Sequence, residues 1–420
     1  MIHRHLIIAY TLLITSLTVT FAQAQEPEAS YFDGADSIDP GENFSPGTDA
    51  TFTSLLQPRL QTPADAVAPE APSRSARSSQ RSSYVRLARA PSMFGDSITP
   101  GGIMVMQRVD GNNIITDVPL GGGRLMKVGE NNKPLPTDRV YFVYNGFQNA
   151  ATFIPFPNNV PAPVETNLNR YTVGFEKTFF NETCSIDVRL PIVDDFQAND
   201  GEGFTLDSGN VGDLVMFFKQ LMYQGDHLAV AGGLGVSLPT GSNVQGTFDD
   251  ASFVIQNESV HLLPYIGFLA TPNDDWFITG FLQLDFATNG NDVVLASVRR
   301  PGELVDQNLF HADISVGRWL MRNEHNCYGR GVALVSELHY TTSITDSQPF
   351  NFNTLGIAQN PVFGTIGGTD RRFDVINLTL GVHFEITEFS NLRVAAVAPL
   401  RDDPDRQFDS EIQVSFNRQF

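Results

Sequence analysis

The sequence predicts an all-β protein, a transmembrane antiparallel β-barrel of about twelve strands preceded by a disordered N-terminal leader. Three observations predict it. The chain opens with an export signal, its C-terminal two thirds alternate apolar and polar residues, and the connections between these alternating segments are short and long in turn. The mean hydropathy is −0.12 and no long apolar run follows the signal, so any membrane insertion must use amphipathic strands rather than helices.

The N-terminus has the three parts of a secretory signal. Residues 3–5 form a basic head, residues 6–21 are apolar and uncharged, and residues 22–24 read A-x-A. A transmembrane anchor is the alternative, but the apolar stretch is shorter than the ~20 residues that a spanning helix needs. We therefore expect a cleaved signal peptide at 1–24 and export to the outer membrane.

Two regions separate the signal from the strands. Residues 25–90 are rich in Pro, Ser, Ala, Asp and Glu and predict a disordered periplasmic linker, although its basic end could instead contact an anionic envelope polymer. Residues 91–138 combine Gly- and Pro-rich turns with short apolar pieces and predict a plug or collar. Gly121 to Gly123 are expected to be turn residues, because no strand–loop–helix context for a phosphate site surrounds them.

Regular alternation begins at Arg139 and predicts the barrel over 139–420. The expected strands are 139–148, 168–180, 183–192, 211–223, 227–238, 259–270, 275–287, 308–321, 330–342, 372–386, 391–398 and 409–420. Short connections follow the even strands and long connections follow the odd ones. This is the asymmetry of periplasmic turns and outer loops, which a soluble sandwich has no reason to show.

The same period assigns the strand faces. On the third strand Ile186 and Val188 should face lipid, while Asp187 and Arg189 face the lumen. Val188→Arg should therefore be costly, whereas Arg189→Val should leave assembly largely intact. The sixth strand is apolar on both faces and contains Pro264, which predicts a bulge with Leu263 and Tyr265 pointing inward.

Two stretches resemble known groups. The alternating segment 411–420 ends on Phe420 and resembles the closing strand of bacterial outer-membrane barrels, in which a terminal Phe is part of the assembly signal. The run Gly212-Asp213-Leu214, then Lys219, then the Gly-rich residues 229–238 closing on Pro-Thr-Gly at 239–241, resembles the outer-membrane channels linked to the phenol meta-cleavage pathway, themselves similar to fatty-acid-transporter-like barrels. The likeness covers about 211–290 and implies passive uptake of small molecules, aromatic or apolar ones included.

Polar residues on the inward faces are the candidates for lining the lumen and setting its selectivity. They are Asp187, Arg189, Asp213, Lys219, His311, Asp313, Glu337, His339, His383 and Glu385. Through the short turn between the eighth and ninth strands, Asp313 should lie opposite His339 and Ser315 opposite Glu337. Such groups could ligate a metal, but a hydrogen-bonded wall is the commoner arrangement. For Asp213 and Lys219, a purely structural role in the turn and the strand is the alternative.

The remaining features limit the function. No G-x-S-x-G, H-E-x-x-H or P-loop motif is present, so neither an enzyme nor a cofactor is expected. The net charge of −20 argues against nucleic acid. Cys184 and Cys327 should be free thiols on nearly opposite sides of the ring. The prediction is a small-molecule channel in contact with outer-membrane lipid and with the assembly machinery through Phe420. A structural or adhesive barrel with functional outer loops is the main alternative, and an autotransporter is a third.

Overall fold

A computed structural model provides the coordinates for the barrel and for the segment that precedes it. The residues it describes are 87–97, 101–107, 113–119, 126–155, 163–194, 196–199, 204–248, 251–295, 302–323, 325–346, 348–355, 361–367, 372, 374–402 and 405–420. The signal peptide expected at 1–24 and nearly all of the linker expected at 25–90 lie outside them. None of the described helical residues forms a helix long and apolar enough to cross a membrane.

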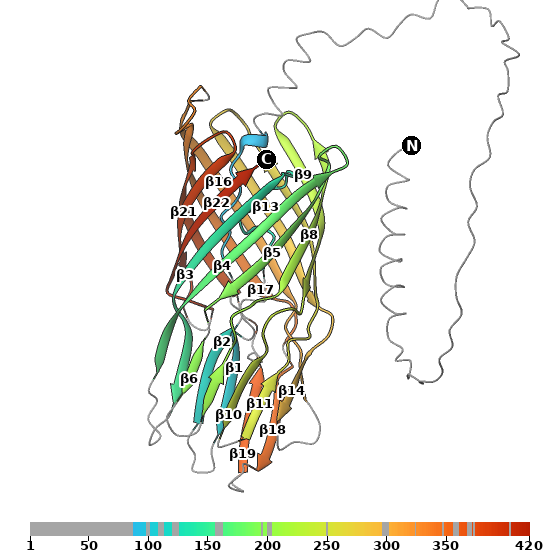
Figure 1. The fold of residues 1–420 in the computed structure, drawn as a ribbon, viewed down its shortest axis with the longest axis vertical. Helices are drawn as coiled ribbons and strands as arrows, with labels where there is room; N and C mark the ends of the chain where they lie inside the picture. The colour runs from blue at the N-terminus through green and yellow to red at the C-terminus, as the bar shows by residue number, and fades with distance from the viewer. Residues whose placement is uncertain are drawn as a thin grey trace, which may run out of the picture. The chain divides into compact units, whose positions relative to one another are not determined.

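Twelve antiparallel strands close into a ring, as the sequence predicts (Figure 1). In chain order they are β3 (Arg139–Pro155), β4 (Val164–Phe179), β5 (Cys184–Val193), β8 (Leu214–Gln224), β9 (Leu228–Leu238), β12 (His261–Ala270), β13 (Trp276–Ala287), β16 (Leu309–Arg322), β17 (Gly331–Ser343), β20 (Asp374–Glu385), β21 (Ser390–Pro399) and β22 (Ser410–Gln419). Each strand pairs with its neighbour in the chain, and β22 returns to pair with β3. The ring therefore has no free edge.

The strand faces follow the predicted alternation. On β5, Ile186 is 43% exposed on the outside, whereas Asp187 and Arg189 are buried on the inside. The same alternation runs along β16, where His311, Asp313 and Ser315 are buried and face inward. Apolar side chains form the outer surface, as a lipid environment requires.

The short and long connections lie at opposite ends of the barrel. The short turns lie at the end that carries the C-terminus, which by the usual asymmetry is the periplasmic end (Figure 1). Further strands that the sequence did not predict lie at the other end. The hairpin of β1 (Gly101–Gln107) and β2 (Asn113–Pro119) precedes β3, and the long connections contain β6 (Gln197–Asn199), β7 (Thr205–Asp207), β10 (Val244–Phe248), β11 (Ala251–Ile255), β14 (Asn291–Leu295), β15 (Gly302–Leu304), β18 (Phe350–Leu355) and β19 (Pro361–Gly367).

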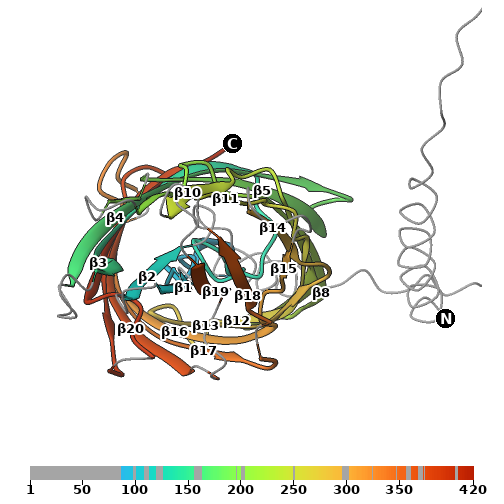
Figure 2. The ribbon, with the colours of Figure 1, turned by 90° about the horizontal axis from the view of Figure 1, so that it is seen from below.

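These additional strands build the outer end. Strands β18, β19, β1 and β2 extend the barrel sheet from β3, while β15, β14, β11, β10, β7 and β6 form a separate sheet. Strands β1, β2, β19 and β18 lie beyond the outer end of the ring (Figure 1) and overlie its opening when seen from this end (Figure 2). An apolar cluster rich in phenylalanine, including Phe153, Phe196, Phe204 and Phe253, is buried in these outer elements.

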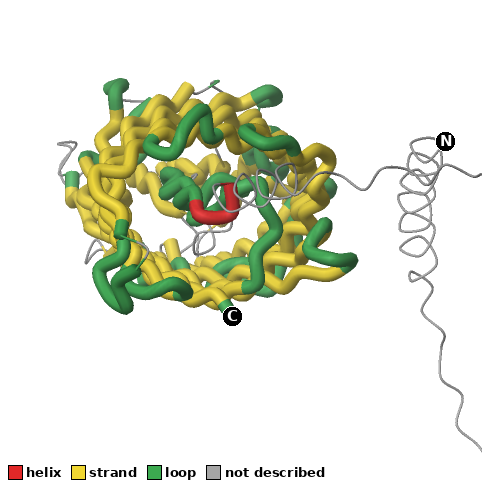
Figure 3. The backbone as a smooth tube through the Cα atoms, turned by 90° about the horizontal axis from the view of Figure 1, so that it is seen from above, coloured by secondary structure: helices red, strands yellow, loops and turns green. Residues whose placement is uncertain are grey.

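The N-terminal part of the described chain lies inside the ring (Figure 3). Leu87 and Leu135 pack with Trp319 and Ala333 at the periplasmic end, whereas β2 pairs with the outer extension of β3. The chain therefore runs from the periplasmic end to the outer end, forms the β1–β2 hairpin and returns before β3 begins. We call residues 87–97 and 126–137 the luminal segment.

Strand β12 departs from its prediction in one respect. Leu263 and Tyr265 point inward as expected, with exposures of 1% and 7%. The expected bulge at Pro264 is absent, because the pairings of β12 with β13 keep one register on both sides of it. Only the pairings of Leu263 and Pro264 with β13 are missing. Because Pro264 has no N–H donor, the ladder between β12 and β13 is interrupted at this point, but no extra residue is inserted.

Candidate functional site

The barrel lumen has two unlike sides, and the luminal segment contacts both. Strands β8, β12 and β13 contribute an apolar stripe that includes Phe217, Tyr265 and Phe281, and Met93 and Met126 of the luminal segment pack on it. The remaining strands contribute charged and amide side chains that are buried against the polar side of the same segment. Every predicted lumen residue except Glu385 is buried.

One ion-pair cluster joins β3, β4, β5 and β8 in the periplasmic half. Glu176 accepts from Arg139 Nε at 2.8 Å and from Lys219 Nζ at 2.9 Å. Asp187 accepts from Arg189 Nη2 at 2.8 Å and from the Tyr141 hydroxyl at 2.7 Å. Both carboxylates are fully buried, so these charges stabilise the fold only as long as the partners remain in place.

This cluster also holds the luminal segment. Lys219 Nζ donates to Asn132 Oδ1 and to the Lys133 carbonyl, each at 2.8 Å. Arg189 Nη1 donates to the Lys127 carbonyl at 3.0 Å. The predicted candidates Arg189 and Lys219 therefore bind the luminal segment through hydrogen bonds.

A second cluster lies on β16 and β17, where the predicted pairing is confirmed. Asp313 is opposite His339 in the ladder, and its Oδ1 lies 2.9 Å from His339 Nδ1. Asp96 of the luminal segment joins them, and together these three residues offer ligand atoms within 4.8 Å of one another. Lys127 Nζ contacts Asp96 and lies 2.8 Å from Asp313 Oδ1. A lysine ammonium thus supplies the cation of this cluster, and a metal ion would have to displace it.

Glu337 is the most direct tie between the barrel and the luminal segment. Its two carboxylate oxygens accept from the backbone N–H groups of Phe94 and Gly95 at 2.9 and 2.8 Å. Ser315 Oγ, opposite Glu337 as predicted, donates to the same carboxylate at 3.0 Å. Gly95 has φ +78°, and a Cβ there would lie 2.7 Å from Glu130 Cα, so the position requires glycine.

Residues that the sequence analysis missed complete the polar contacts. Arg170 of β4 contacts Glu130 and Ser97, and Arg393 of β21 donates to Asn131 Oδ1 at 2.7 Å. Both arginines occupy inward positions of their strands, which the period-two pattern could have indicated. Their partners on the luminal segment carried no such signal.

Asp213 lies just before β8 at the outer end of the barrel, away from Lys219 in the periplasmic half of that strand. Its Oδ1 accepts from Gly241 N at 2.9 Å and from Asn257 Nδ2 at 2.6 Å, while Thr240 Oγ1 accepts from Leu214 N at 2.9 Å. These bonds tie the Pro-Thr-Gly turn to the start of β8. These contacts of Asp213 agree with a structural role for the Gly-Asp-Leu and Pro-Thr-Gly parts of the motif, the alternative given above.

A serine, a histidine and an aspartate meet at the outer end, a constellation the sequence analysis did not find. Ser259 Oγ lies 3.2 Å from His261 Nε2, and His261 Nδ1 lies 2.6 Å from Asp285 Oδ1. Ser259 Oγ, however, donates to the Asn289 carbonyl at 2.8 Å, and His261 Nε2 also faces Asp306 at 3.5 Å. An imidazole held between two carboxylates is suited to clamping the outer loops rather than to accepting a proton from serine.

The periplasmic mouth carries the last predicted pair, His383 and Glu385. His383 is buried with its ring edge-on to Trp319, and Glu385 is half-buried. Lys133 of the luminal segment lines the same mouth and donates to the Ala88 carbonyl at 2.6 Å. Burial lowers the pKa of Lys133 to about 7, and the nearby Arg139 cation acts in the same direction.

The closed ring, the apolar outer surface and the polar lumen define an outer-membrane β-barrel. The family described as "Putative MetA-pathway of phenol degradation" matches residues 145–347, which confirms the resemblance found in residues 211–290. No curated protein matches the chain in sequence.

Several solved structures are similar to the barrel part of this chain. An outer membrane channel from Pseudomonas putida F1 is 10% identical with a TM-score of 0.43, covering 69% of this chain and 97% of its own. The Pseudomonas putida toluene transporter TodX is 8% identical with a TM-score of 0.38 and coverages of 72% and 96%. The translocator domain of autotransporter NalP from Neisseria meningitidis is 9% identical with a TM-score of 0.41 and coverages of 68% and 89%.

Proposed function

We propose that the protein is an outer-membrane channel for passive uptake of small molecules, aromatic and apolar ones included, and that the luminal segment is its gate. Transport is diffusion down a gradient and needs neither a cofactor nor catalysis. The family match supports this, since the family is described by the degradation of phenol. The apolar stripe around Phe217, Tyr265 and Phe281 offers a surface for such solutes once Met93 and Met126 move away.

The observation that carries the proposal is the polar attachment of the luminal segment. Buried ion pairs contribute less stability than well-packed apolar side chains of the same volume, so a lumen closed permanently would have no need of them. Contacts such as Lys127–Asp313 and Glu337 with the Phe94 and Gly95 amides can be exchanged for water. A polar wall therefore suits a lumen that is hydrated for part of the time.

The proposal also places the chain in its membrane. A signal peptide cleaved after residue 24 would deliver it to the periplasm, and lipid would cover the outer faces of the strands. Phe420 is 60% exposed and stacks on Phe175 with ring centroids 6.0 Å apart. This accessible terminal aromatic is the expected contact for the outer-membrane assembly machinery.

One cross-linking experiment tests the gate. Asn131 Nδ2 of the luminal segment donates to Asn417 Oδ1 of β22 at 3.0 Å. With Cys184 and Cys327 replaced by serine, Asn131→Cys and Asn417→Cys can be bridged by a short bifunctional thiol reagent that contains a cleavable disulfide. Proteoliposomes with the bridged barrel should exclude small phenolic solutes, and reduction of the reagent should restore their flux.

The single-cysteine variants treated with the same reagent are the controls. Equal flux before and after reduction would show that the luminal segment is not the gate. Absence of flux and of single-channel conductance in every form would refute the channel.

The alternative is a structural or adhesive barrel whose outer loops are the functional part. The outer strands favour it, since the long loops are folded into sheets with their own apolar cluster. Removal of the hairpin β10–β11 separates the two functions. If the outer loops are the functional part, this deletion should abolish surface attachment. If the lumen is the functional part, the deletion should leave solute flux intact.

A further inference from the structure

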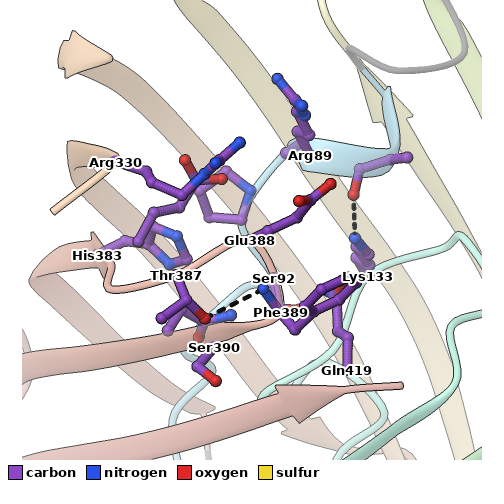
Figure 4. A pocket seen from close by; sticks show the side chains of 15 residues that line it. Arg89, Ser92, Lys133, Arg330, His383, Thr387, Glu388, Phe389, Ser390 and Gln419 are labelled. Carbon is purple, nitrogen blue, oxygen red and sulfur yellow. Dashed lines mark hydrogen bonds between the residues drawn. The ribbon is translucent and has the colours of Figure 1, made fainter. Parts of the chain in front are cut away.

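A cavity opens at the periplasmic mouth between the luminal segment and the barrel wall (Figure 4). Residues 88–92 and Lys133 form one side, and Arg330, His383 and the turn at 387–391 form the other. Its volume is ≈ 60 Å³. A single water needs about 10–15 Å³ on this scale, so the cavity has room for a molecule of four or five heavy atoms.

Three basic side chains of this cavity, Lys133, His383 and Arg330, form no ion pair with the residues that the structure describes. Lys133 Nζ donates only to the Ala88 carbonyl at 2.6 Å, and no carboxylate among the described residues lies within ion-pairing distance of it. His383 is 3% exposed, and its Nδ1 has no hydrogen-bond partner. Arg330 donates to the Asn326 carbonyl at 3.2 Å. Buried polar and charged groups that lack such partners destabilise the fold unless a bound molecule pairs with them.

The charges that surround Lys133 do not compensate for its burial. Arg139 and Lys219 are further cations, and the carboxylate of Glu176 beside them is already bonded to both. Glu385 faces Lys133 from β20. Together with burial, this excess of positive charge lowers the pKa of Lys133 to about 7. A bound anion would supply the missing partner.

We propose that the cavity binds a small carboxylate anion, with Lys133 Nζ and His383 Nδ1 as donors and Arg330 at its rim. A monoanion fits better than a dianion, because the carboxylates of Glu385 and Glu388 also line the cavity. For His383 this requires the tautomer that carries the proton on Nδ1. The site stands whether or not the barrel conducts solutes, since it needs only the observed contacts.

Trp319 provides the readout, because its ring lies 5.6 Å from that of His383. The chain has 2 Trp, so Trp276→Phe leaves Trp319 as the sole indole. Titration of this variant with acetate at constant ionic strength should give a saturable fluorescence change, with matching heat in calorimetry. Lys133→Met should weaken acetate binding about tenfold or more, the loss expected for a charge-assisted hydrogen bond. The affinity should also fall as the pH rises through about 7, where Lys133 loses its proton.

Lys177→Met is the matched control, since Lys177 lies at the same rim but is exposed and pairs with Asp138. It should leave the affinity unchanged. If Lys133→Met fails to give a heat-modifiable barrel, His383→Gln tests the second donor by calorimetry, with the same expected loss. Absence of saturable binding by both methods, equal affinity in the donor variants, or tighter binding of inorganic phosphate than of acetate would overturn the carboxylate site.

Discussion

Glu337 ties the luminal segment to β17, and Glu337→Gln should weaken that tie in the closed state. The carboxylate accepts the backbone N–H groups of Phe94 and Gly95, one on each oxygen. A glutamine side chain keeps one of these acceptors and directs its NH₂ group at the other donor. The volume of the side chain is unchanged, so the substitution changes hydrogen bonding and charge rather than packing.

The expected cost follows from the lost bond. A hydrogen bond to a charged group contributes about 1.5–3 kcal/mol, and the amide that loses its acceptor in a buried site adds a penalty of about 1–3 kcal/mol. Partial relaxation leaves an estimate of about 2–4 kcal/mol, or a factor of roughly 30 to 700 in an equilibrium constant. In an open state water would solvate residue 337, so the loss should fall mainly on the closed state.

Single-channel recording in planar bilayers measures this shift directly. The ratio of open to closed time should rise by the factor given above, with the open conductance unchanged. Glu411→Gln is the matched control, because Glu411 is equally buried on the lumen wall but its described hydrogen bonds go only to Asn145 and Gln413 of the strands. Equal open probabilities in wild type, Glu337→Gln and Glu411→Gln would refute the gating role of this contact.

Three further predictions test the faces and the thiols. Val188→Arg places a charge on the lipid side and should destabilise the barrel by ~2–4 kcal/mol in urea unfolding, and an unchanged midpoint would contradict the face assignment. Arg189→Val, which the alternation alone predicts to be tolerated, should instead cost about 3–5 kcal/mol because Asp187 is left buried without its closest cation, and adding Asp187→Asn should recover part of the loss. A maleimide should label exposed Cys327 but not buried Cys184 in the folded barrel, whereas a gel shift on reduction would show a disulfide that the structure excludes.

The pairing of β16 with β17 shows why much of the site was predictable. A short turn sets the register of two consecutive strands, so Asp313 and His339 could be placed opposite each other from their distances to the turn. The period of two then decides which side chains face inward. Both rules are local, and they hold without knowledge of the rest of the chain.

The partners of these residues were not predictable in the same way. Asp96, Lys127 and Glu130 lie in a stretch without strand periodicity, and they meet the wall only because the segment runs through the closed ring. The outer strands were missed for a related reason. Pairs such as β7 with β10 join different loops, and their short sequences carry little alternation of their own.

The sequence by itself determined that the chain forms a barrel, how many strands close it and which side chains face inward, because alternation and connection length are local properties. Only the tertiary structure decided what occupies the interior. Residues 87–97 and 126–137 reach Glu337, Asp313 and Lys219 through space, and a contact between residues so far apart in the chain exists only once the ring has closed around the segment.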